Sequence, residues 1–75
     1  MTTQPILYDP ATDSMYVTLR QGPAVHTIAH DDRDYAVDIG ADGEPIGYDI
    51  QFACQHPDVI AEALRLLHQD TSRAA

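Results

Sequence analysis

Apolar and polar residues alternate along most of this chain, a pattern typical of short strands with one buried face. In the clearest case every second residue from Met15 to Leu19 is apolar, and the residues between them are Tyr16 and Thr18. Gly, Pro and Asp residues interrupt the pattern where turns are expected. It predicts five strands, at Ile6–Tyr8, Ser14–Arg20, Ala24–His30, Tyr35–Ile39 and Pro45–Phe52.

Two of the turns have specific chemistry. Asp9-Pro10 is a favourable start for a β-turn, and Asp42-Gly43 is a strong signal for a tight hairpin. The strand that follows the second turn has the most apolar face of the chain. We expect that face to consist of Ile46, Tyr48, Ile50 and Phe52.

One amphipathic helix is predicted after the strands. Pro57 suits the first helical position, Asp58 complements the helix dipole, and the helix runs to about His68 or Gln69. Its wide apolar arc can pack on the sheet and still contact a second subunit, or it can simply cover the sheet. The arc contains Val59, Ile60, Ala63, Leu64, Leu66 and Leu67, and the opposite face contains Asp58, Glu62, Arg65 and Gln69.

These elements predict one α+β domain, a small antiparallel β-meander of two hairpins and about five strands packed against one C-terminal α-helix. We expect the domain to span residues 6–69, between a flexible leader, residues 1–5, and a flexible tail, residues 70–75. A chain of 75 residues has a small core, and its single cysteine, Cys54, can form no internal disulfide. A second subunit is the remaining way to bury apolar surface, so a homodimer is expected.

The chain is strongly acidic, with 12 Asp and Glu residues, 4 Lys and Arg residues and a formal net charge of −8. Such a surface repels phosphate, so we expect no direct binding to nucleic acid, whereas a basic protein partner would be attracted. The charge could also serve solubility alone. We find no secretory signal and no run of about 20 apolar residues, and the lone thiol fits a reducing compartment. A cytoplasmic protein without a membrane partner is expected.

A set of turn and core motifs, spread from Ile6 to Leu67, resembles the small bacterial proteins catalogued as domain of unknown function 2283. The resemblance implies a meandering sheet with a C-terminal helix, and an antitoxin-like partner of small toxins related to ribosome-dependent nucleases. It carries over no catalytic residues, and the segment Gln51–His56 is less charged than the family pattern leads us to expect. The motifs are Tyr8-Asp9-Pro10-x-x-Asp13-x-x-Tyr16-Val17-x-Leu19, Val37-Asp38-Ile39, Asp42-Gly43 and Ile46-Gly47-Tyr48-Asp49-Ile50.

The densest group of possible metal ligands is His30 with Asp31, Asp32 and Asp34, but it lacks the glycine and the closing glutamate of a calcium loop. A solvated connector between strands explains it better. His26 and His30 share one strand face, where they lie about 13 Å apart and cannot chelate one ion within a subunit. They could form a pH-sensitive rim at a dimer or partner surface.

Cys54 and His56 form a conceivable nucleophile pair near the helix start, but no orienting Asn or Asp accompanies them. We therefore expect no catalytic residue, no cofactor and no metal. The leading hypothesis is a non-enzymatic acidic module that neutralises a basic toxin by covering its cationic substrate groove. The expected partner-binding residues are Tyr16 as an anchor and the acidic residues Asp31, Asp32, Asp34, Asp38, Asp42 and Glu44.

Two alternatives remain open. A phage-type anti-defence inhibitor would mimic nucleic acid and block a nucleic-acid-binding machine, using the same negative surface. A small metal-binding or thiol enzyme would use either His30 and the aspartates or Cys54 and His56.

Overall fold

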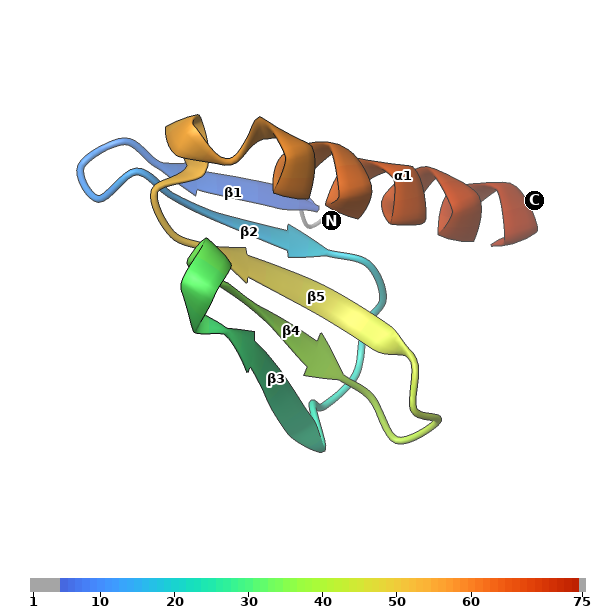
Figure 1. Ribbon diagram of the computed structural model, residues 1–75. Coiled ribbons are helices and arrows are strands. Elements are labelled where there is room, and N and C mark those ends of the chain that lie inside the picture. Colours follow the sequence, from blue (N-terminus) through green and yellow to red (C-terminus); the bar gives the residue numbers. More distant parts are fainter. Residues whose placement is uncertain (1–4, 75) are drawn as a thin grey trace.

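The computed structural model describes the backbone of residues 5–74 and the side chains of residues 5–69 (Figure 1). Five strands, two short 3-10 helices and one long helix make up an α+β domain, as the sequence predicts. Residues 1–4 of the expected leader lie outside the described part. The elements are β1 (Ile6–Asp9), β2 (Ser14–Thr18), β3 (His26–His30), η1 (Asp31–Arg33), β4 (Tyr35–Ile39), β5 (Pro45–Ile50), η2 (Ala53–Gln55) and α1 (Pro57–Ala74).

The strands form one antiparallel sheet in the order β1-β2-β5-β4-β3. A β1–β2 hairpin and a β3–β4–β5 meander are joined through β2 and β5, which are distant in the sequence (Figure 1). The chain between β2 and β3 therefore passes from the strand next to one edge of the sheet to the opposite edge. The inner strands β2 and β5 carry Val17 and Ile50, whose side chains have no exposed surface. Burial of these apolar residues favours an inner position for their strands.

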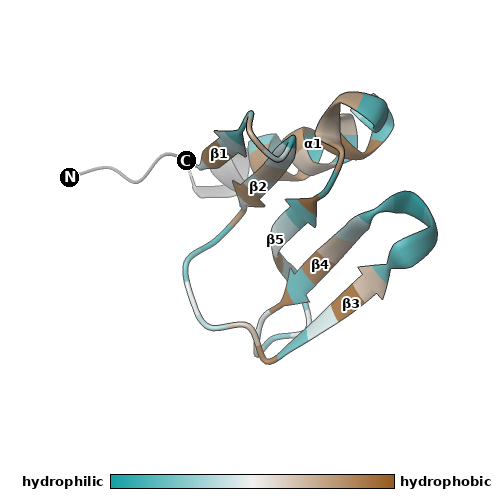
Figure 2. Ribbon diagram, turned by 90° about the vertical axis from the view of Figure 1, so that its left-hand side faces the viewer, coloured by the Kyte–Doolittle hydropathy of each residue, from teal (hydrophilic) through white to brown (hydrophobic). Residues whose placement is uncertain are grey.

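Helix α1 covers one face of the sheet and packs mainly on β2 and β5 (Figure 1). Val59 and Ala63 of the helix join Val17, Ile50 and Tyr48 in the core cluster. Burial of a side chain as large as Ile50 contributes about 1.5–3 kcal/mol to stability. Strand β3 lies at the edge away from the helix, and its residues are exposed except for the half-buried final histidine (Figure 2).

The helix is longer than the sequence suggests. It continues to Ala74 and does not end near Gln69, so the expected flexible tail, residues 70–75, is helical as far as the structure describes it. The segment after Gln69 contains neither Gly nor Pro, and without such a residue nothing local stops the helix.

The expected position of Phe52 on the apolar face of the fifth strand is wrong, because β5 ends at Ile50. The backbone N–H groups of Gln51 and Ala53 donate hydrogen bonds to the carbonyl oxygens of Asp34 and Asp13. These bonds turn the chain between them, and Phe52 takes a left-handed conformation with φ 51°. Its side chain is 52% exposed.

Glu62 was expected on the polar face of the helix, but its side chain is half-buried against the sheet. Its Oε2 accepts a hydrogen bond of 2.9 Å from the hydroxyl of Tyr48. Burial and this hydrogen bond raise the pKa of Tyr48. The polar end of a core tyrosine therefore determines where this carboxylate lies.

Candidate functional site

The face of the sheet opposite α1, which we call the open face, is the candidate site. Because side chains alternate between faces, the strand register places one row across all five strands on this side. That row consists of Leu7, Tyr16, Asp49, Ala36 and Ala29. A second row beside it on the same face consists of Thr18, Gly47, Asp38 and Thr27.

Tyr16 lies across the centre of the open face. Its ring covers Gly47, where a Cβ atom would collide with the tyrosine hydroxyl, so only glycine leaves room for this arrangement. The hydroxyl donates a 2.7 Å hydrogen bond to Oδ2 of Asp38, and Oδ1 of Asp38 accepts a second 2.7 Å bond from Thr27. Partial burial, the bond to Asp38 and the nearby charge of Asp49 raise the pKa of Tyr16 to about 12.

A pocket of about 200 Å³ lies beside this centre, at the end of the sheet that carries η1. Ala29 and Ala36 are the small residues of its lining, and short side chains at these two positions leave the face hollow. The polar part of the lining comes from Asp31, Asp34, Asp49 and Gln51, so three carboxylates surround the space. A pocket with these walls suits a cationic side chain.

The structure brings together four of the seven predicted binding residues. Tyr16 and Asp38 are hydrogen-bonded at the centre of the open face, and Asp31 and Asp34 line the adjacent pocket. Asp32 is an exposed residue of η1 and is not part of that lining.

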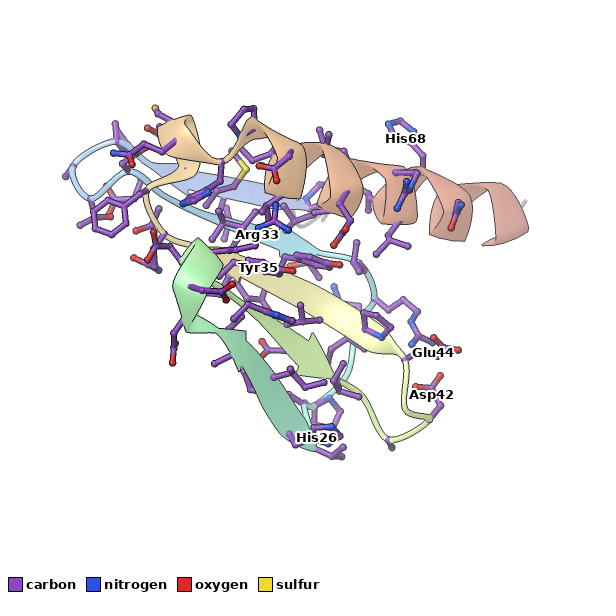
Figure 3. The ribbon with its side chains drawn as sticks, in the orientation of Figure 1. His26, Arg33, Tyr35, Asp42, Glu44 and His68 are labelled. Carbon is purple, nitrogen blue, oxygen red and sulfur yellow. The ribbon has the colours of Figure 1, made fainter. Side chains whose placement is uncertain are left out.

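The other two, Asp42 and Glu44, lie in the β4–β5 turn at the opposite end of β4 from η1 (Figure 3). Asp42 forms an ion pair with Arg20, with an N–O distance of 2.9 Å. The hydrogen bonds from Arg20 and from the backbone N–H of Glu44 hold the pKa of Asp42 below its usual range. The predicted acidic set is therefore divided between two ends of the sheet.

Asp49 is the important residue that our sequence prediction did not include. It lies beside Tyr16 in the register of β2 and β5, it is exposed, and it also lines the pocket. The signal that could have found it is the alternation of β5, because Tyr48 and Ile50 point to the core and the residue between them must point away.

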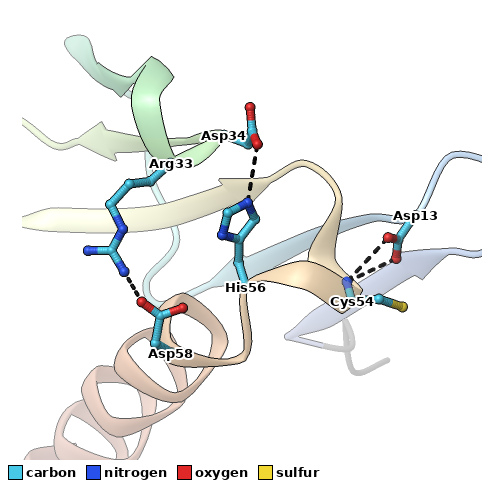
Figure 4. Close-up of polar contacts among 6 residues, drawn as sticks. All are labelled: Asp13, Arg33, Asp34, Cys54, His56 and Asp58. Carbon is cyan, nitrogen blue, oxygen red and sulfur yellow. Dashed lines mark hydrogen bonds and ion pairs between the residues drawn. The ribbon is translucent and has the colours of Figure 1, made fainter.

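The segment between β5 and α1 uses its polar groups to hold three parts of the fold together (Figure 4). The backbone N–H of Cys54 donates to both carboxylate oxygens of Asp13, at 3.2 Å each. Hydrogen bonds from Cys54 and Tyr8 hold the pKa of Asp13 below its usual range. The conceivable Cys54–His56 nucleophile pair, which the sequence does not favour, finds no support here, because Nε2 of His56 lies 3.2 Å from Oδ2 of Asp34.

Arg33 of η1 forms an ion pair with Asp58 in the first turn of α1, and this contact adds to the one between Asp34 and His56 (Figure 4). Among the described residues, no group of three or more His, Cys, Asp or Glu side chains is arranged to hold a metal ion. No helix in the described part of the chain is long and apolar enough to cross a membrane.

A family model described as "Protein of unknown function (DUF2283)" matches residues 6–53, which include all five strands. The match confirms the resemblance that the turn and core motifs indicated. Comparisons with the curated proteins and with the solved structures give no significant match.

Proposed function

Because the chain belongs to the DUF2283 family, whose function is unknown, we propose a function for it from the open face. The protein is a non-enzymatic binding module that docks this face on a basic protein, as an antitoxin neutralises a basic toxin. The observation that carries the proposal is the charge distribution of the sheet. None of the five strands contains a Lys or Arg residue, while the open face presents Asp38 and Asp49 beside an aromatic ring.

The centre of the open face is organised to receive a cation before any partner arrives. Asp38 accepts hydrogen bonds from two neutral hydroxyl groups, which fix its orientation and leave acceptor sites on the carboxylate. An arginine of the partner could bind Asp38 or Asp49 with charge-assisted hydrogen bonds and stack on the ring of Tyr16. Such a fixed geometry lowers the ordering cost of binding.

The adjacent pocket provides a second position for a cationic side chain, between Asp31, Asp34 and Asp49. The remaining acidic residues, such as Asp42 and Glu44 in the distant turn, lie outside this contact area. They contribute to the net charge of −8 and therefore to the rate at which a basic partner approaches. The carboxylates of the open face are thus proposed to contact the partner, and those of the distant turn to attract it over longer distances.

The first experiment is affinity capture of the tagged protein from its native lysate at low and moderate salt. We expect a small basic protein that is lost as the salt concentration rises. A multi-subunit nucleic-acid-binding complex in its place would favour the inhibitor that mimics nucleic acid.

The purified partner then allows the surface to be mapped by binding kinetics. Replacement of Asp38 and Asp49 by Asn should weaken affinity about 10- to 100-fold, mainly through faster dissociation, because direct charged hydrogen bonds are lost. The matched control, Asp42→Asn with Glu44→Gln, removes the same charge and should mainly slow association. Equal losses in the two double variants would show that the open face is not the docking surface.

A further inference from the structure

Strand β3 is an outer strand of the sheet whose free edge has no protective feature. Natural edge strands usually carry a charged residue, a proline or a bulge that prevents pairing with another chain. The sequence of β3, His26-Thr27-Ile28-Ala29-His30, contains none of these residues. Two of the large apolar side chains exposed in this protein, Ile28 (46%) and the preceding Val25 (57%), lie along it.

The charge distribution along the chain favours this edge as a contact between two copies. Each copy carries a net charge of −8, so two copies repel each other over most of their surface. Residues 21–30 contain no Asp, Glu, Lys or Arg, so this stretch adds no like-charge repulsion of its own when two copies approach. The other outer strand, β1, ends in Asp9 and is less suitable.

The sequence of β3 is also nearly symmetric about its centre, with Ile28 in the middle and a histidine at each end. Antiparallel pairing around a twofold axis requires such a self-complementary surface. With Ile28 on the axis, it faces Ile28 of the second copy, and His26 faces the second copy's His30. The apolar row Val17, Tyr48, Val37 and Ile28, which crosses the sheet on the helix side, then continues into the second copy.

We propose that two copies of this chain pair through β3, with Ile28 on the twofold axis, to form one continuous sheet. Both open faces then lie on the same side of that sheet, and both helices lie on the other. This pairing is independent of any basic partner, because it uses the uncharged edge of β3 and not the acidic open face.

Oligomeric state in solution gives the first test, by sedimentation or by light scattering during gel filtration. The chain should be a dimer, and Ile28→Lys should raise the dissociation constant about 100-fold, because it places two like charges at the centre of the contact. The variant should remain folded, since the side chain is already 46% exposed, and circular dichroism checks this. A wild-type chain that is monomeric at every concentration would overturn the proposal.

Disulfide trapping tests the register, in a Cys54→Ser background that removes the native thiol. Ile28→Cys should form an interchain disulfide rapidly, because directly opposite Cβ atoms of paired strands are close enough to be bridged. Thr27→Cys is the matched control, because it lies one position off the axis and should react much more slowly. A dimer that survives Ile28→Lys, or that cross-links both positions equally, would place the contact elsewhere.

Discussion

The two faces of the sheet are made by the same strands but have opposite properties. The helix-covered face is apolar, with Val17 and Ile50 fully buried, whereas the open face presents Tyr16 and two carboxylates. Asp49 and Ile50 are consecutive residues that belong to different faces. Burial and exposure therefore change from one residue to the next along β5, and the side chain proposed to bind a partner directly follows and precedes side chains of the core.

The largest difference in stability is expected between substitutions of the neighbouring residues Ile50 and Asp49. Ile50→Ala leaves a cavity under α1 and should lower the free energy of unfolding by about 2–5 kcal/mol. Asp49→Asn should leave that free energy almost unchanged, because the side chain is exposed and accepts a hydrogen bond from the side chain of Gln51, which is exposed too. Urea denaturation of both variants measures the difference. Similar values for the two would mean that the faces are not energetically distinct.

A smaller loss of stability is expected from substitution of Gly47, on which the ring of Tyr16 packs. Gly47→Ala forces the ring of Tyr16 off the sheet and should cost about 1–3 kcal/mol, through overpacking and the lost bond to Asp38. The double variant with Tyr16→Ala removes the obstacle, so the added methyl group should then be tolerated. A double-mutant cycle from urea denaturation tests this coupling. Additive effects would contradict the packing of Tyr16 on Gly47.

Tyr16→Phe removes only the hydroxyl and should cost about 1 kcal/mol at neutral pH, the typical value of one hydrogen bond. The pKa of Tyr16 is raised from 10.0 to about 12 in the folded protein. The folded state therefore holds this proton more tightly, and its contribution is complete below pH 10 and is lost as the pH rises towards 12. Stability of the variant should fall less steeply over that range, as measured by denaturation at several alkaline pH values.

The smallest effect concerns the distant turn. The lowered pKa of Asp42 means that its pairing with Arg20 stabilises the fold above the usual pKa of the carboxyl, and this contribution is lost as the pH falls through the lowered value. Both side chains are partly exposed, so solvent screens the pair. Arg20→Gln should lower the free energy of unfolding slightly at neutral pH and leave it unchanged in acid, as measured by urea denaturation at both pH values. A large loss at neutral pH would show that the pair has a structural role.

Most of the fold could be predicted from the sequence because its signals are local. Alternation identified the five strands, and Pro57 with Asp58 marked the helix start that the structure shows. The strand order could not be predicted in the same way, because no local pattern indicates that β2 pairs with β5. The conformation of Phe52 is set by backbone hydrogen bonds to two distant turns, and an apolar side chain gives no sign of them.

The candidate site was only partly predictable. Tyr16 and Asp38 follow from alternation, but a list of acidic residues does not show that Asp31 and Asp42 lie at opposite ends of one strand. The role of Gly47 also requires the structure, because it depends on a ring that crosses from the neighbouring strand. Alternation within a strand predicts the face on which a side chain lies. It does not predict which side chain of the adjacent strand lies beside it.

The pairing of β2 with β5 has a consequence for the kinetics of folding. The β1–β2 hairpin and the β3–β4–β5 meander are local, whereas the contact of Thr18 with Gly47 closes a long loop and is slow to form. We expect the two units to form early and their docking to limit the folding rate. Val17→Ala at this contact should then slow refolding, as measured by stopped-flow mixing.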